Sequence, residues 1–211
     1  MWIFALAGGV ILGGVTLICV WTRRTTEVPL FDRPHDNPQI GVILEIAVAN
    51  LASCGRRGYY VLRDVTIPRA YGKSSQIDVI LIYRHCIIAF ECKNWSGAVS
   101  GKHEGEWTQT LSNGAVYSHT NPIKQNAGHA AAVREYLDNS IGIKPYIHSV
   151  IVFGPNCTLG AVSAPSWKQC VIRIDELLDE IERTVKTGKL SINAEQNYNA
   201  LVGCAKYHIP G

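Results

Sequence analysis

The sequence lacks the short motifs that mark several common classes of enzyme and metalloprotein. None of its seven cysteines forms a C-x-x-C pair, and no cluster of histidines and cysteines has the spacing of a zinc site. It also lacks a glycine-rich phosphate loop and a G-x-S-x-G elbow. These absences exclude the corresponding motif-based sites. Five histidines have no metal spacing to one another, and we interpret them as surface or core residues: His85, His103, His119, His129 and His148.

A strong charge excess and internal repeats are also absent. The net charge is +3 over 211 residues, which is too small to indicate a nucleic-acid-binding protein by itself. The length suits one globular domain of roughly 100–200 residues, and the thiol pattern suits a reducing compartment. One segment, residues 54–75, is locally basic, and charge alone favours a solvated loop there. It contains a single acid, Asp64, and five cations: Arg56, Arg57, Arg63, Arg69 and Lys73.

The N-terminus carries a long uncharged run. Residues 2–21 are bracketed by tryptophans, and 20 residues at about 1.5 Å each span a bilayer core of about 30 Å. Because Arg23 and Arg24 follow the run, the positive-inside rule places the N-terminus outside and the rest of the chain in the cytoplasm. A cleavable signal peptide is the alternative, but its basic start and cleavage pattern are missing. We expect a single-pass membrane protein with a transmembrane anchor at residues 1–22.

Small residues recur every four positions within this run, at Ala5, Gly9 and Gly13. This spacing lets two membrane helices approach closely and would suit a homodimer, although glycine is common in membrane helices in any case. Residues 23–36 carry charges and prolines without an apolar period, which predicts a juxtamembrane linker. The folded domain is expected at residues 37–211.

Apolar patterns after the linker predict an α/β fold in which helices flank a mixed sheet. Asn-Pro pairs at 37–38 and 121–122 are typical helix starts. The expected helices are 38–53, 122 to about 139, 176–187 and about 194–206. The expected strands are 59–64, 76–83, 86–93, 147–153 and 170–174, with a shorter strand around Val99 and Trp107.

Two of these strands carry acids inside apolar runs. If the loop at 84–85 has two or four residues, positions whose numbers sum to 169 face each other, which sets Asp78 opposite Glu91. The same register sets Gln76 opposite Lys93, and the period of two places these four side chains on one face. A loop of odd length would shift the register.

Opposed carboxylates on a sheet repel each other, so one must stay protonated or a cation must bridge them. Oxygen ligands without thiolate or imidazole select Mg²⁺ or Mn²⁺. Lys93 could hold a water or a phosphate oxygen there, and such a site suits phosphodiester hydrolysis. The alternative is a salt bridge between Asp78 and Lys93 at a sheet edge, with Glu91 facing solvent.

An ordered set of motifs resembles the NERD (nuclease-related) domain over roughly residues 41–137. The motifs are Gln76-Ile77-Asp78, Glu91-Cys92-Lys93-Asn94 with Gly97, Trp107, and Asn121-Pro122-Ile123-Lys124-Gln125-Asn126. The helix with Gly41 and Glu45 fits the opening motif, although Leu44 stands where the family often has glycine. The resemblance implies the PD-(D/E)XK nuclease superfamily, with a restriction-endonuclease-like mixed sheet and a metal-dependent phosphodiesterase site.

The resemblance also implies roles for individual residues. Asp78 and Glu91 match the metal-binding acids, and Lys93 matches the lysine of the ExK element. Glu45 matches the first-helix acid that can complete the metal site. Gln125 falls where some members have a helix glutamine near the site.

We expect Gln76 and Gln125 to contact substrate, although Gln125 could equally be a polar cap residue and Gln76 could satisfy a backbone group. Trp95 and Trp107 could stack on bases, but core packing is the simpler role for both. The leading hypothesis is a membrane-anchored nuclease that hydrolyses DNA or RNA on the cytoplasmic side with Mg²⁺. The alternatives are a tethered nucleic-acid or protein-binding module of the same fold, and a structural anchor that scaffolds partners.

Overall fold

The computed structural model describes residues 38–53, 57–84, 86–164, 169–188 and 192–210. The expected anchor at 1–22, with its small-residue spacing, and the linker at 23–36 lie outside this part of the chain. Among the described residues, no helix has both the length and the apolar character needed to cross a membrane.

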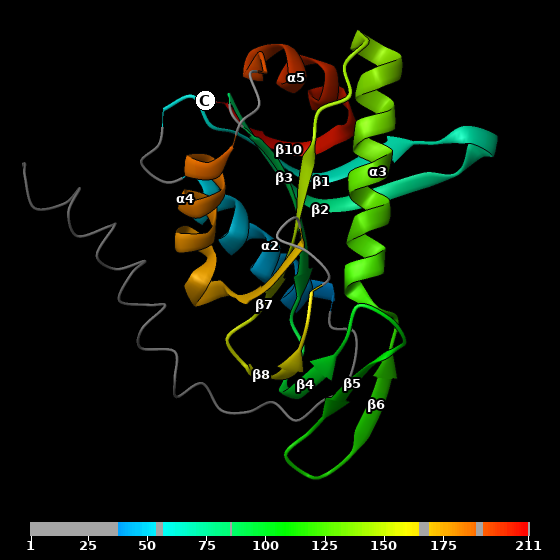
Figure 1. The fold of residues 1–211 in the computed structure, drawn as a ribbon, viewed down its shortest axis with the longest axis vertical. Helices are drawn as coiled ribbons and strands as arrows, with labels where there is room; N and C mark the ends of the chain where they lie inside the picture. Colours follow the sequence, from blue (N-terminus) through cyan, green and yellow to red (C-terminus); the bar gives the residue numbers. More distant parts are fainter. Residues whose placement is uncertain (1–37, 54–56, 85, 165–168, 189–191, 211) are drawn as a thin grey trace, which may run out of the picture. The chain divides into compact units, whose positions relative to one another are not determined.

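Six strands form a mixed sheet in the order β10-β1-β2-β3-β7-β9 (Figure 1). The first four strands in this order pair with one another in antiparallel fashion, whereas β7 is parallel to both β3 and β9. Their bounds are β1 Tyr60–Pro68, β2 Ser74–Tyr83, β3 Cys86–Lys93, β7 Ile147–Phe153, β9 Gln169–Arg173 and β10 Ala205–Ile209. Strand β7 is buried along its whole length, including the polar residues His148 and Ser149 within its otherwise apolar sequence.

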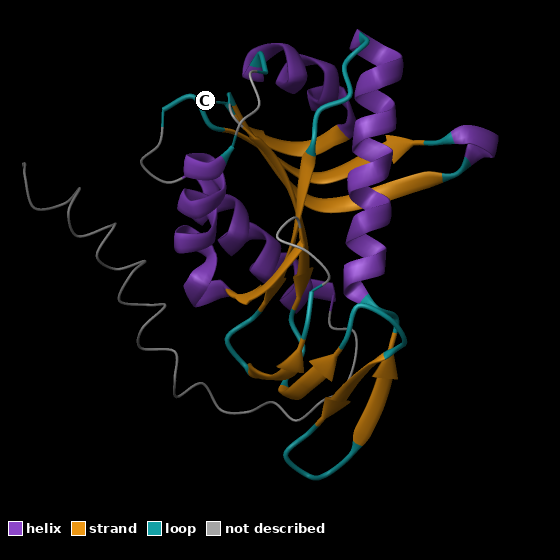
Figure 2. Cartoon of the chain, viewed as in Figure 1, coloured by secondary structure: helices purple, strands orange, loops and turns teal. Residues whose placement is uncertain are grey.

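Helices cover both faces of this sheet (Figure 2). Helices α2 (Pro38–Ser53) and α4 (Leu177–Thr187) pack on one face over a core that includes Val79 and Phe90. Helices α3 (Pro122–Ile141) and α5 (Ala194–Leu201) pack on the other face over a core that includes Ile80. The expected mixed sheet flanked by helices is therefore confirmed.

A second sheet of four strands, in the order β6-β5-β4-β8, continues from the ends of β3 and β7 (Figure 1). Its strands are β4 Gly97–Gly101, β5 Trp107–Thr110, β6 Val116–His119 and β8 Cys157–Val162. Trp107 is fully buried and its ring stacks on Phe153 with centroids 5.9 Å apart, so core packing is its observed role. The one short strand expected around Val99 and Trp107 is two strands, β4 and β5, and the sequence did not indicate β6 or β8.

The C-terminal helix is shorter than expected. Helix α5 ends at Leu201, a 3₁₀ turn covers Val202–Cys204, and residues 205–209 form β10 along the outer edge of β1. The prediction of a helix to residue 206 is wrong because β10 is a short edge strand with three exposed residues at its centre. Such a strand has no apolar alternation that could reveal it.

Charge alone favours a solvated loop for the basic segment at residues 54–75, but the structure shows no such loop in the described part of this segment. Its described part forms most of β1 and the turn into β2, and Arg63 lies within β1. The Arg63 guanidinium lies 3.9 Å from the centre of the Tyr207 ring on β10 and 3.8 Å from Glu45 on α2. Part of the positive charge therefore supports the fold.

Candidate active site

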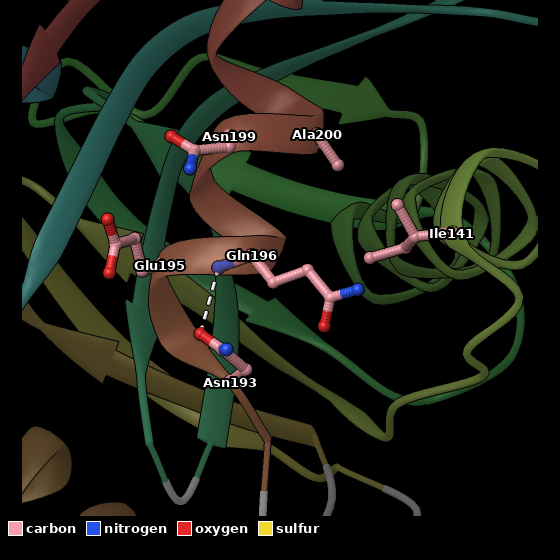
Figure 3. Close-up of a pocket in the computed structure, with 6 residues that line it drawn as sticks. All are labelled: Ile141, Asn193, Glu195, Gln196, Asn199 and Ala200. Carbon is pink, nitrogen blue, oxygen red and sulfur yellow. Dashed lines mark hydrogen bonds between the residues drawn. The ribbon is translucent and has the colours of Figure 1, made fainter.

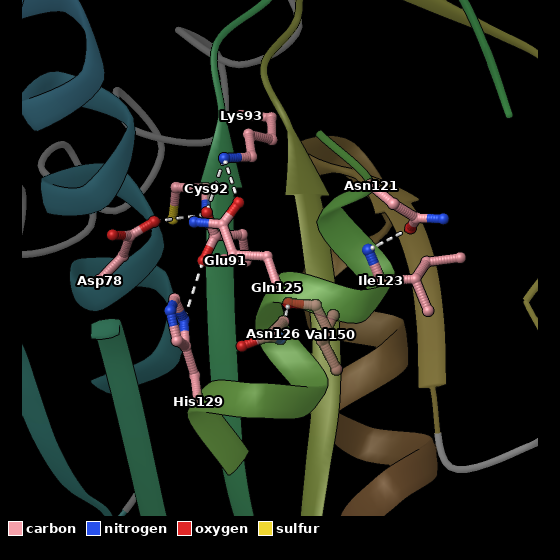
Figure 4. Close-up of polar contacts among 10 residues, drawn as sticks. All are labelled: Asp78, Glu91, Cys92, Lys93, Asn121, Ile123, Gln125, Asn126, His129 and Val150. Carbon is pink, nitrogen blue, oxygen red and sulfur yellow. Dashed lines mark hydrogen bonds and ion pairs between the residues drawn. The ribbon is translucent and has the colours of Figure 1, made fainter. Parts of the chain in front are cut away.

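The register between β2 and β3 is the one that the sequence predicts. Pairs run from Tyr83 opposite Cys86 to Val79 opposite Phe90, so the residue numbers of each pair sum to 169. The ladder ends there, one position before Asp78 and Glu91 would pair. The backbone N–H of Cys92 instead donates to Asp78 Oδ2 at 2.7 Å (Figure 4). Asp78 therefore closes the gap where the two strands separate.

Glu91 is a buried carboxylate between a lysine and a histidine. Its side chain is 3% exposed, and Lys93 Nζ lies 2.7 Å from Oε1. On its other side, His129 Nδ1 lies 3.1 Å from Oε2 (Figure 4). Burial alone would raise the pKa of Glu91, but the His129 and Lys93 contacts outweigh it and hold the pKa below its ordinary value. The alternative with Glu91 in solvent and Lys93 paired to Asp78 is wrong.

Asp78 behaves in the opposite way. Burial, followed by repulsion from Glu91, raises the pKa of Asp78 from 3.8 to about 7, against the lowering effect of the Cys92 hydrogen bond. Near neutral pH, Asp78 can therefore gain or lose a proton, whereas an ordinary aspartate is fully ionised there. The two acids are thus divided into one ionised group and one group poised to exchange a proton, which is typical of functional sites.

Helix α3 supplies the opposite wall of the site. Lys93 Nζ donates to Gln125 Oε1 at 3.1 Å, so the glutamine lies beside the acids as expected (Figure 4). His129 follows Gln125 by four residues and therefore lies on the same helix face. His129 has no metal spacing to another histidine, so the sequence did not mark it as a site residue. Its position four residues after Gln125 puts it on the same helix face but does not show that it reaches Glu91.

Asparagines fix the position of this helix. Asn121 caps α3 by accepting from the N–H groups of Ile123 and Lys124 at 3.0 and 3.3 Å. One turn later, buried Asn126 donates to the carbonyls of Ala89 on β3 and Val150 on β7 at 2.9 and 3.2 Å. This amide links α3 to both central strands and so fixes the position of Gln125 and His129 along the strands relative to Glu91.

Two glycines permit the chain to leave β3 and β7 as it does. Gly97 has a φ of +78°, and a Cβ there would lie 2.3 Å from the backbone oxygen of Thr110. A Cβ at Gly154 would lie 2.3 Å from Asn94 Oδ1. Gly97, which ends the Glu91-to-Gly97 motif, is therefore required because the backbone of Thr110 leaves no room for a side chain there.

The remaining two expected site residues lie next to this cluster. Burial raises the pKa of Glu45 on α2, and Glu91 is among the charges that raise it further. Its ion-pair partner is Arg63. Gln76 is exposed, lies opposite Thr66 of β1, and donates to Asp64 Oδ1 at 2.7 Å. The expected pairing of Gln76 with Lys93 does not occur, because β2 and β3 have already separated.

The donor chemistry of Asp78 and Glu91 fits a hard cation such as Mg²⁺ or Mn²⁺. Oε2 of Glu91 is buried, and its contact with His129 Nδ1 at 3.1 Å is not a well-oriented hydrogen bond. Across the described ranges, no three His, Cys, Asp or Glu side chains are grouped closely enough to hold a metal ion. An ion held by these two acids would therefore draw further ligands from water or substrate.

A separate hollow lies where α5 begins, beside the end of α3 (Figure 3). Asn193 caps α5 there by accepting from the Gln196 N–H at 3.0 Å. None of the site residues lines this hollow, so the catalytic hypothesis does not extend to it. Its lining consists of Ile141, Asn193, Glu195, Gln196, Asn199 and Ala200.

Comparisons with known proteins bear on this geometry. The sequence pattern of the nuclease-related domain (NERD) matches residues 41–154, which is more than half of the chain and includes every candidate site residue. A Bacillus anthracis protein described as uncharacterized is 32% identical over 133 residues. The match covers 63% of this chain and 60% of that protein, so the chain spans less than two thirds of the relative.

Proposed function

We propose, given that the chain belongs to the nuclease-related domain family of the PD-(D/E)XK-like nuclease superfamily, that it hydrolyses phosphodiester bonds of DNA or RNA. The observation that carries the proposal is the Asp78, Glu91 and Lys93 cluster. An acid with a raised pKa, an acid with a lowered pKa and an ammonium gather where β2 and β3 separate. This combination is suited to positioning water against a phosphate.

Each side chain has a defined part in this proposal. Asp78 and Glu91 would hold Mg²⁺ or Mn²⁺, which when bound would lower the pKa of water and offset charge on the phosphate. The Lys93 ammonium, oriented by Gln125 and Glu91, would hold the attacking water or a phosphate oxygen. His129 would keep the Glu91 carboxylate in place from the other side. Glu45 would add negative charge near the cation.

A binding module of the same fold is the second candidate. The observation in its favour is that both oxygens of Glu91 already have partners, the ammonium of Lys93 and the imidazole of His129. Such neutralisation would allow the fold to persist without a metal ion and without turnover. The module would still present the same surface to nucleic acid.

One assay separates the two candidates. The purified full chain is incubated with single- and double-stranded DNA and RNA in Mg²⁺, Mn²⁺ or EDTA. The same is done with Asp78→Asn and Lys93→Ala, and with Lys144→Ala as a control for an exposed lysine. Metal-dependent cleavage lost in the first two variants alone supports the nuclease. Binding without cleavage supports the module. The absence of both cleavage and binding rejects both candidates.

We further propose that residues 1–22 anchor the domain at the cytoplasmic side of a membrane, with a homodimer formed through the small residues of that run. The uncharged run and the arginines after it support this proposal. Fractionation of cells that express the full chain tests it. Recovery in the soluble fraction would reject the anchor, and accessibility of a tag at residue 211 to added protease reports the orientation.

A further inference from the structure

The hairpin of β1 and β2 extends beyond the main sheet and projects at the right of Figure 1. Strand β3 pairs with β2 only from Val79 onward, and β10 pairs with β1 only as far as Val65. Beyond these points the two strands pair with each other alone, down to Pro68 opposite Ser74. We call residues 66–77 the arm.

The arm is held firmly at both ends. Ile77 at its base and Ile67, which lies opposite Ser75 closer to the tip, are fully buried in the core that includes Leu137 of α3. At its tip, the Arg69 N–H donates to the Lys73 carbonyl at 2.8 Å and closes the loop. The tip therefore has a defined shape on an anchored base.

Tyr71 at the tip is in an unfavourable local state. Its backbone is left-handed, with φ 60° and ψ 33°, and the residue is 99% exposed. A bulky side chain is strained in this region, where glycine or asparagine is favoured, and exposure gives it no compensation from burial. Neither the turn nor the core explains a tyrosine here, and strain without structural benefit is a mark of functional positions.

The surroundings of Tyr71 define the chemistry that it suits. Arg69 and Lys73 flank it, both are exposed, and residues 66–77 contain no acid. An exposed aromatic ring between cations matches an unpaired base with phosphates on either side. Stacking on aromatic side chains is the usual way in which proteins hold single strands.

An accessible face connects the tip to the candidate active site. Burial alternates along β2, so that Ser74 and Gln76 are exposed while Ser75 and Ile77 are buried, and Asp78 continues the accessible face. Lys73 and Asp78 are five residues apart, which is about 17 Å of strand at roughly 3.3 Å per residue. About five stacked nucleotides, at roughly 3.4 Å each, cover that length.

We propose that the arm binds single-stranded nucleic acid, with Tyr71 stacked on a base about five nucleotides from the phosphate at Asp78 and Arg69 and Lys73 on the neighbouring phosphates. This inference rests on the proposed function, because it names the substrate of that site. The exposed amide of Gln76 lies on the path between them and can contact the strand.

The test measures binding of the full chain in EDTA, so that no metal-dependent turnover occurs. The probes are a fluorescein-labelled single-stranded DNA of about 20 nucleotides, the RNA of the same sequence, and the DNA duplex. A probe of about 20 nucleotides covers the proposed site several times. Tyr71→Asn should weaken single-strand binding about 5- to 100-fold, as expected for loss of one stacked base. Its thermal midpoint should not fall, because asparagine suits the left-handed backbone. Tyr71→Trp should bind like the wild type.

Charge variants complete the test. Lys73→Ala should lower the slope of log Kd against log salt by about 0.7, as expected for one phosphate contact on a single strand. Lys186→Ala, at an exposed lysine on α4, should leave the slope unchanged.

The outcomes separate the arm from the active site. Wild-type affinity in Tyr71→Asn overturns the arm proposal, and so does tighter binding of the duplex than of either single strand. In both cases metal-dependent cleavage would still uphold the proposed function. Failure of the wild-type chain to bind any of the three probes in EDTA also overturns the arm proposal, and the metal-dependent cleavage assay then decides the proposed function by itself. The relative affinities for DNA and RNA identify the substrate.

Discussion

Lys93 Nζ lies 2.7 Å from Oε1 of Glu91, two positions earlier on the same strand. Alternate residues of a strand share a face, so both side chains point toward α3. Gln125 on that helix binds the ammonium, and His129 contacts the second carboxylate oxygen. One strand and one helix therefore suffice to keep a buried carboxylate charged.

Removal of Lys93 should reveal the free-energy cost of burying the charged Glu91 carboxylate. We expect Lys93→Ala to lower the free energy of unfolding at neutral pH by about 2–3 kcal/mol, because Glu91 keeps its charge and loses a partner. Since the pKa of Glu91 is lowered in the folded state, its stabilising contribution is present above the unfolded pKa and is lost as the pH falls. The difference between variant and wild type should therefore shrink in acid. Urea denaturation at several pH values measures it.

The matched control is Lys144→Ala, which removes the exposed partner of Asp138. Exposed ion pairs contribute little, so this variant should change stability by no more than about 0.5 kcal/mol. Equal losses in the two variants would contradict the role assigned to Lys93.

Asp78 should make the protein less stable as the pH rises. Its pKa is about 7 in the folded state against an ordinary 3.8, so the folded state holds more protons between these values. The free energy of unfolding should fall across this range, by about 2–3 kcal/mol between about pH 5 and about pH 8. Asp78→Asn, which still accepts from the Cys92 N–H, should abolish most of this fall. If the free energy of unfolding changes with pH in the same way in the variant and the wild type in EDTA, the assignment of the raised pKa to Asp78 is rejected.

Asn126 should be a stability determinant despite its polarity. Asn126→Ala leaves the buried carbonyls of Ala89 and Val150 without this donor, and we expect a loss of about 2–3 kcal/mol. Chemical denaturation measures the loss, with Asn199→Ala at an exposed position of α5 as the control. The control should stay within about 0.5 kcal/mol. A comparably mild effect at Asn126 would mean that α3 does not depend on this link.

A comparison of Gly97 with Gly114 separates the stability cost of a strained backbone from the stability cost of a close contact. Both have positive φ, but only a Cβ at Gly97 would meet backbone, 2.3 Å from the Thr110 oxygen, whereas Gly114 faces open space. Gly114→Ala should cost about 1 kcal/mol from its φ alone. Gly97→Ala should cost about 3 kcal/mol or more and should perturb the chain beside Lys93. Thermal denaturation ranks the two, and a reversed order would contradict the close approach.

The sequence predicted those parts of the site that depend on local pattern. The period of two and the short connection predicted the β2–β3 register, and the Asn-Pro start placed Gln125 on a helix. The contact of His129 with Glu91 depends on how α3 sits across the sheet, and that is decided by Asn126 bonding to two strands. No pattern within the helix contains this information. In the same way, the end of the β2–β3 ladder beyond Val79 depends on the separation of whole strands.

Short polar strands escaped prediction for a different reason. Strands β6 and β10 have exposed residues at alternate or successive positions, so their side chains show no apolar period. Their pairing comes from neighbours that are distant in sequence or joined by a turn. Backbone hydrogen bonding to an existing edge requires no particular side chain, and such strands are therefore nearly invisible in composition.

The hydrogen bond from the Cys92 N–H to Asp78 gives this acid a structural duty besides its proposed chemistry. Loss of activity in a descendant of this protein would remove the need for a charge at position 78 but not the need for an acceptor. We therefore expect Asp or Asn to persist at this position in inactive relatives. In comparisons of such sequences, an acid at this position is therefore weak evidence of catalysis by itself.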